Sequence, residues 1–213
     1  MTETSTKYPL NFSVDYPEKL NRLTTLFRLP MVLPIFIVLA LLAGSSGSQG
    51  SGTGGDWGWQ YGGAAAITFA PLVLMLLFRK KYPRWWFDWN IALTKFCLRF
   101  TAYLSLLRDE YPSTDEEQAV HLEIDYPDAS KDLKRGMPLV KWFLAIPHYI
   151  ILSFLWFFAI VCVVIAWFAI LLTGRYPRGL FDFVVGVYRW SLRVDVYALL
   201  LTTDRYPPFS LND

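Results

Sequence analysis

Three stretches of the chain are mostly apolar and contain no charged residue. They are residues 29–44, 62–78 and 142–173. The first two have about the length of a short membrane-spanning helix, because a hydrocarbon core of about 30 Å requires roughly 17–25 apolar residues. The third stretch is long for one crossing and just long enough for two short helices joined by a tight turn. The pattern therefore predicts a mainly α-helical membrane protein.

Basic residues lie at the ends of these apolar stretches. They are Lys19, Arg22 and Arg28 before the first, Arg79, Lys80, Lys81 and Arg84 after the second, Lys131, Lys134, Arg135 and Lys141 before the third, and Arg175 and Arg178 after it. Flanking clusters of this kind face the cytoplasm. An even number of crossings is therefore expected between successive clusters.

This requirement predicts two transmembrane helical hairpins, 29–44 with 62–78 and 140–156 with 158–173, giving four crossings and two cytoplasmic termini. The alternative is that residues 142–173 form one long, tilted helix, which would place Arg175 and Arg178 on the opposite side. A tight turn usually contains Gly or Pro, and the chain has neither near Trp156. Both interpretations stay open at this point.

The chain also repeats itself. Tyr-Pro occurs seven times, although 12 tyrosines and 13 prolines in 213 residues would give fewer than one by chance. The segment KYPRWWFDWNIALTKFCLRFTAYLSLL, residues 81–107, aligns without a gap to RYPRGLFDFVVGVYRWSLRVDVYALLL, residues 175–201. FSVDYPEKL likewise resembles LEIDYPDAS, Pro34 corresponds to Pro147, and the halves close with DEYP and DRYP. We interpret the chain as two tandem repeats, 1–113 and 114–213.

Each repeat begins with a short alternating stretch. Leu10, Phe12 and Val14 alternate with polar residues in the first, and Val120, Leu122 and Ile124 do so in the second. Alternation that ends at Tyr-Pro predicts a short cytoplasmic strand, since proline has no N–H to donate.

Each repeat ends with an amphipathic segment, 84–107 or 178–201. Helical spacing places Asp88, Lys95 and Arg99 on one face of the first, and Asp182, Arg189 and Arg193 on one face of the second. We expect helices that lie at the membrane interface with tryptophans at headgroup depth, because a basic residue at the centre of a span costs about 2.5–3.5 kcal/mol. These two polar stripes either pair between the repeats or with backbone groups, or bind anionic lipid headgroups.

The doubled YPRxxFD…R…Y block with its closing DxYP resembles the family of membrane proteins described as domain of unknown function 4389 (DUF4389), in both halves of the chain. The resemblance implies a small membrane protein of bacterial type, placed in the inner (cytoplasmic) membrane. It implies no activity.

Other chemistry is weakly represented in the sequence. There is no phosphate-binding glycine loop, dinucleotide fingerprint, HExxH or CxxC. Cys97 and Cys162 lie in apolar segments as expected of packing residues, and His148 is expected to be neutral and hydrogen-bonded within a membrane helix. A net charge of +2 gives no reason to expect nucleic acid. We therefore expect no cofactor, no metal ion and no catalytic site.

The resulting expectation is a non-enzymatic scaffold or accessory subunit of a membrane complex, or of a self-assembly. Its partners would be the lipid bilayer and other membrane subunits or further copies of the chain. A lipid-binding or lipid-moving protein that takes anionic lipids is the main alternative. A small channel or transporter is less favoured, because the apolar stretches contain few polar residues beyond Thr68, Ser153 and His148.

Overall fold

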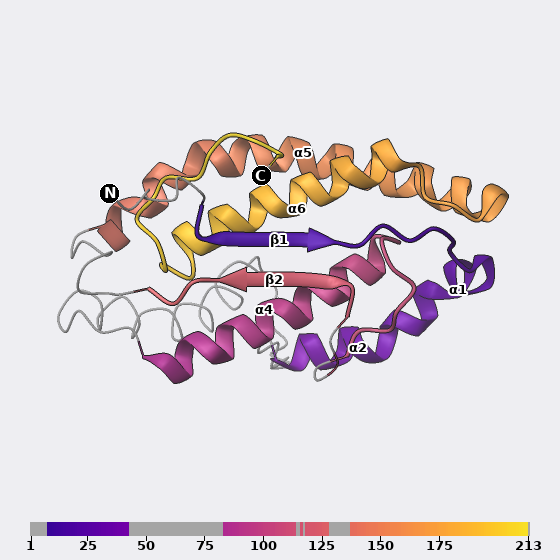
Figure 1. The fold of residues 1–213 in the computed structure, drawn as a ribbon, viewed down its shortest axis with the longest axis horizontal. Helices are drawn as coiled ribbons and strands as arrows, with labels where there is room; N and C mark the ends of the chain where they lie inside the picture. The colour runs from indigo at the N-terminus through magenta and orange to yellow at the C-terminus, as the bar shows by residue number, and fades with distance from the viewer. Residues whose placement is uncertain (1–7, 43–82, 114–115, 117, 128–136, 213) are drawn as a thin grey trace, which may run out of the picture.

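The computed structural model describes residues 8–42, 83–113, 116, 118–127 and 137–212. This part of the chain is mainly helical, and its longer elements run along one common direction (Figure 1). The elements are β1 (Leu10–Val14), α1 (Arg22–Leu26), α2 (Arg28–Leu42), α4 (Arg84–Leu104), β2 (Val120–Ile124), α5 (Met137–Thr173) and α6 (Arg178–Ala198).

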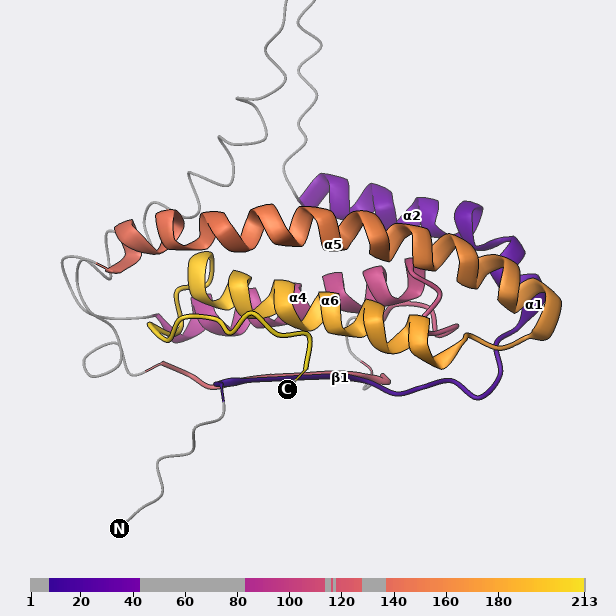
Figure 2. The ribbon, with the colours of Figure 1, turned by 90° about the horizontal axis from the view of Figure 1, so that it is seen from above.

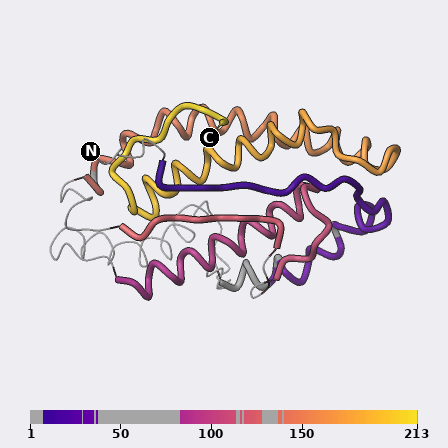
Figure 3. Tube along the Cα trace, viewed as in Figure 1, coloured from indigo at the N-terminus to yellow at the C-terminus, as the bar shows by residue number. Residues whose placement is uncertain are grey.

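The elements are stacked in three layers. Figure 2 shows α2 and α5 in one outer layer, α4 and α6 in the middle, and the strands in the opposite outer layer. The tube in Figure 3 shows that α5 and α6 lie side by side and run in opposite directions. Each middle helix is therefore covered by a helix on one side and by the sheet on the other.

The two strands form an antiparallel sheet centred on one residue pair. Phe12 lies opposite Leu122, with Leu10 opposite Ile124 and Val14 opposite Val120. These side chains face the helices and are mostly buried, whereas the alternate positions are exposed. The strands match the predicted alternating stretches, and both end just before a Tyr-Pro dipeptide.

The two middle helices start and stop in the same way. Pro83 and Pro177 occupy their N-cap positions, where the missing N–H is no loss because helix starts leave donors unpaired. Both helices end three residues before the ends of the predicted segments, 84–107 and 178–201. Just beyond, Leu106 and Leu201 adopt positive φ values of 63° and 55° and bury their side chains, which turns the chain away from the helix axis.

The predicted second hairpin, 140–156 with 158–173, is wrong. One uninterrupted helix of 37 residues, α5, runs through the expected turn at Trp156. Without Gly or Pro at that point nothing in the local sequence interrupts the helix, and α6 packs against α5 on both sides of Trp156. The two helices lie side by side in Figure 3. Four membrane crossings are therefore not formed in this way. Within the described residues, α5 is the one helix long and apolar enough to cross a membrane.

The first predicted hairpin can be followed only in its first arm. Helix α2 covers most of residues 29–44 and contains Pro34, as α5 contains Pro147. The second arm, 62–78, lies outside the described residues.

Small residues bring α5 and α6 close together. Ala145, Ala159 and Ala166 are at most 3% exposed and face the core. Gly174 directly follows α5, and its φ of 75° suits a residue without Cβ. Its carbonyl accepts the amide N–H of Leu20 at 3.0 Å. This bond joins the end of α5 to the first half of the chain.

Candidate functional site

The basic residues of the α6 stripe point toward the sheet and the C-terminal tail, residues 199–212. Arg189 donates to the carbonyl of Phe12 through Nε and Nη2, both at 3.3 Å, and to that of Leu211 at 3.1 Å. Arg193 is buried and donates to the carbonyls of Ser210 at 3.2 Å and Asn212 at 2.7 Å. These arginines hold the tail against the helix and against the edge of β1.

The α4 stripe is less engaged. Arg99 donates to the carbonyl of Ser113 at 2.7 Å, which resembles the bond from Arg193 to the tail. Lys95 is partly buried, while Asp88 and Asp182 are exposed. In the part of the chain that the structure describes, neither aspartate forms an ion pair with an arginine of the other half. Binding of lipid headgroups by these stripes stays a prediction.

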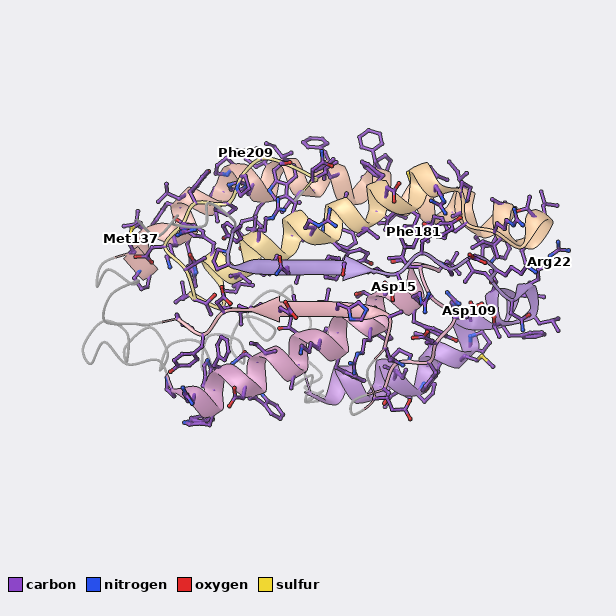
Figure 4. All side chains as sticks on the ribbon, in the orientation of Figure 1. Asp15, Arg22, Asp109, Met137, Phe181 and Phe209 are labelled. Carbon is purple, nitrogen blue, oxygen red and sulfur yellow. The ribbon has the colours of Figure 1, made fainter. Side chains whose placement is uncertain are left out.

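A buried ion pair fixes the start of α2. The guanidinium of Arg28 pairs with the carboxylate of Asp109, which belongs to the closing DEYP and is labelled in Figure 4. Arg28 also donates to the carbonyl of Tyr103 at 2.6 Å and lies 4.4 Å from the centre of that ring. The arginine side chain is only 3% exposed, so the pair is largely removed from solvent.

A second buried ion pair fixes the start of α5. Lys141 Nζ lies 2.7 Å from Asp204 of the closing DRYP, donates to the carbonyl of Thr203 at 2.8 Å, and is 5.2 Å from the centre of the Tyr197 ring. Lys141 corresponds to Arg28, since each precedes the internal proline of its helix by six residues. Sequence reasoning used both residues only as charges flanking an apolar stretch. Their constant distance from Pro34 and Pro147 was the signal that could have identified them.

The Tyr-Pro dipeptide after each strand packs onto the helix start of the other half. Arg178 lies 4.6 Å from the ring centre of Tyr16, and Phe181, labelled in Figure 4, meets the same ring edge-on at 5.1 Å. The Tyr16 hydroxyl also donates to the carbonyl of Tyr176.

The Tyr-Pro dipeptide of the second half makes the equivalent contact with the first half. Arg84 lies 5.2 Å from the ring centre of Tyr126, and Phe87 meets that ring edge-on at 5.0 Å. The Arg and Phe of each YPRxxF block therefore clasp a tyrosine from the other half of the chain. We call these two contacts the reciprocal tyrosine clasps.

His148 of α5 is fully buried against α6 and the tail. Its Nδ1 accepts the indole N–H of Trp190 at 3.1 Å, and Phe209, labelled in Figure 4, stacks on its ring at 4.0 Å. Because Nδ1 accepts a hydrogen bond, the proton of a neutral ring lies on Nε2. The bond from Trp190 agrees with the expectation that His148 is hydrogen-bonded. The described residues contain no cluster of three or more metal-ligating side chains.

The surface of α5 that faces away from α6 is apolar from end to end. We call it the outer face; it consists of Phe143, Ile146, Ile150, Phe154, Phe157, Ile160, Val161, Val164, Phe168 and Leu172, each at least 41% exposed. Three tryptophans of α5 turn their indole N–H groups inward instead, Trp142 to Ala198, Trp156 to Ser191 and Trp167 to Thr25. An exposed apolar surface of this length indicates a partner, either lipid or protein.

Comparison with known proteins shows a family similarity within the second half of the chain. Residues 137–210 match the family model described as Domain of unknown function (DUF4389). We call residues 137–210 the DUF4389 segment. The match begins with α5 and ends at Ser210, so the segment comprises both antiparallel helices, the buried pair at Lys141 and most of the tail. It covers one copy, and residues 1–136 lie outside it. No curated protein and no solved structure matches the chain.

Proposed function

We propose that the chain is a membrane protein of the bacterial inner membrane, built from two tandem repeats, that acts as a scaffold or accessory subunit of a membrane complex or of its own assembly. The observation that carries the membrane placement in this proposal is the outer face, a long apolar surface that the described chain leaves uncovered. The DUF4389 segment supplies that surface.

Corresponding residues in the two halves make corresponding contacts, which supports the duplication. Phe12 and Leu122 occupy equal places in the FSVDYP and LEIDYP segments and lie opposite each other in the sheet. Such a pairing is what a twofold axis through the centre of the sheet would produce. The buried pairs of Arg28 and Lys141 and the reciprocal tyrosine clasps obey the same relationship.

A scaffold role fits the way in which charged groups are used. Arg28 and Lys141 anchor helix starts, and Arg189 and Arg193 hold the tail through backbone carbonyls. These side chains stabilise the fold. The outer face is the apolar surface that stays exposed for contact with lipid or protein.

Gentle solubilisation tests this proposal directly. We expect the chain to leave the membrane only with detergent, and to migrate as a larger species in a mild one, with native mass spectrometry showing other subunits or further copies. Recovery as a lone monomer across several mild detergents would count against a scaffold.

A lipid-binding role is the second candidate, because an apolar groove opens beside the start of α5. Its walls are Trp142, Phe143, Ile146, Tyr149 and Leu199. The test is native mass spectrometry for retained anionic lipid in Arg99→Ala and Arg193→Ala variants. Lys95→Ala serves as the comparison, since the lysine lies on the same stripe as Arg99 and forms no hydrogen bond or ion pair among the described residues. Lipid lost from all three variants would support headgroup binding, whereas loss only from the arginine variants would reflect disturbed packing.

A further inference from the structure

The direction of α5 relative to the other layers decides how the protein can meet a membrane. Helix α5, helix α6 and β1 are stacked in successive layers with roughly parallel axes (Figure 2). Trp142 bonds to Ala198 near one end of α5, Trp156 bonds to Ser191 in the middle, and Ala166 shares a hydrophobic cluster with Phe181 toward the other end. Helix α6 therefore accompanies α5 from Trp142 to about Ala166.

A crossing α5 would carry charged groups into the bilayer with it. Asp182 and Arg189 lie on α6. In the next layer His121 and Glu123 are exposed on β2, and Asp15 is exposed directly after β1. Each charged residue near the bilayer centre costs about 2.5–3.5 kcal/mol on insertion scales. The layered structure thus opposes a perpendicular crossing, although α5 alone has the composition of a span.

The outer face has the opposite character. The hydroxyl of Ser153 donates to the carbonyl of Ile150 at 2.7 Å, and that of Thr173 donates to the carbonyl of Ala169 at 2.7 Å. With the indole N–H groups turned inward as well, this side of the helix directs little but hydrocarbon outward. A surface in contact with lipid chains requires its polar groups to be satisfied internally in this way.

Length points in the same direction. The candidate span Val140–Thr173 has 34 residues and extends about 50 Å at 1.5 Å per residue, whereas the hydrocarbon core is about 30 Å thick. A crossing would need a steep tilt, but a helix about 10 Å in diameter fits lengthwise within one leaflet. A flat helix also keeps Arg175 and Arg178 on the side of the basic residues that precede it, because zero crossings is an even number.

We propose that the outer face of α5 binds a single lipid leaflet: α5 lies flat in the hydrocarbon of that leaflet, α6 lies at headgroup level, and the sheet lies in water on the same side. This inference rests on the membrane association proposed above. It replaces a spanning topology for the DUF4389 segment with a one-sided one.

Depth measurements along α5 test the flat orientation. Spin labels are attached to Phe143→Cys, Phe157→Cys or Leu172→Cys, each in a Cys97→Ser/Cys162→Ala background, in phosphatidylcholine–phosphatidylglycerol vesicles. We expect all three labels at similar depth within one leaflet. A deep label at 157 between two shallow ones would overturn the proposal, because 143 and 172 would then lie at opposite interfaces. Labels shielded from lipid-soluble relaxants would overturn it too, by showing that protein covers the face.

Sidedness provides an independent measurement. Glu123 precedes α5 and Arg175 follows it, and both are exposed. The variants Glu123→Cys and Arg175→Cys therefore place one label site on each side of the helix in the sequence. In sealed vesicles of uniform orientation, an impermeant maleimide should label both or neither. Labelling of only one would disprove the flat orientation while leaving membrane association intact. Failure of the chain to float with vesicles would instead remove the membrane role itself.

Discussion

The ammonium group of Lys141 lies 2.7 Å from the carboxylate of Asp204, and the lysine side chain has no exposed surface. Lys141→Met should therefore lower the free energy of unfolding by about 3–5 kcal/mol, because it removes the lysine charge that faces Asp204 in a largely buried site. Thermal unfolding in detergent measures the loss. The comparison is Arg108→Ala, which removes a more exposed pair with Glu110 and should cost less than about 1 kcal/mol. Equal effects of the two substitutions would contradict the importance of burial.

The continuity of α5 leads to a second prediction at its middle. Phe157 is 63% exposed, so Phe157→Ala should alter the fold little. Phe157→Pro should destabilise the protein by about 3 kcal/mol or more, because proline removes a hydrogen bond within the helix and clashes with the preceding turn. Limited proteolysis and circular dichroism would detect the break. A turn at this position, as in the hairpin topology, would instead accept the proline without loss of stability.

The contact between Gly186 and the tail gives a third prediction. A Cβ at this position would lie 3.0 Å from Leu211 Cβ and 3.1 Å from its carbonyl oxygen, so Gly186→Ala should push the tail away from α6. Digestion of the tail by carboxypeptidase should become faster. Gly179→Ala is the matched control, since its Cβ would meet nothing within 4 Å and the change should stabilise the helix by up to about 1 kcal/mol. The same digestion rate in both variants would refute the close approach.

A fourth prediction concerns pH. Burial raises the pKa of Asp195 to about 6, above its ordinary value of 3.8. Folding therefore favours the protonated carboxyl, and this contribution is fully present below about pH 4 and lost as the pH rises through 6. We expect the free energy of unfolding to fall by about 1–3 kcal/mol across this window. Asp195→Asn should flatten that part of the profile in chemical unfolding measured from pH 4 to pH 7. An unchanged slope would show that another group is responsible.

Local patterns were enough to predict several elements. Alternation gave both strands, because side chains that alternate along a strand face opposite sides of the sheet. Tyr-Pro gave the starts of α4 and α6, since proline is tolerated at a helix start.

The predicted hairpin of residues 140–156 and 158–173 was wrong because of the kind of evidence used for it. It was inferred from the sides on which charges should lie, and that rule constrains only the parity of crossings, which a flat helix also satisfies.

The contacts of the stripe residues could not be read from helical spacing alone. Spacing placed Arg189 and Arg193 on one face, but their partners are backbone carbonyls of β1 and of the tail. Such carbonyls carry no residue-specific signal in the sequence. The buried pair of Arg28 and Asp109 was missed because 81 residues separate its members. Only comparison of the two halves, where Lys141 and Asp204 hold equal places, makes the pair visible.

The reciprocal tyrosine clasps have a consequence for how such a protein could originate. Under the proposed duplication, neither half closes its own YPRxxF block, because Tyr16 and Tyr126 each serve the other half. A chain with one copy would leave its clasp empty until a second molecule supplied the missing ring. Its simplest folded form is a symmetric pair of chains that exchange tyrosines, and joining two such genes end to end would make that partnership permanent.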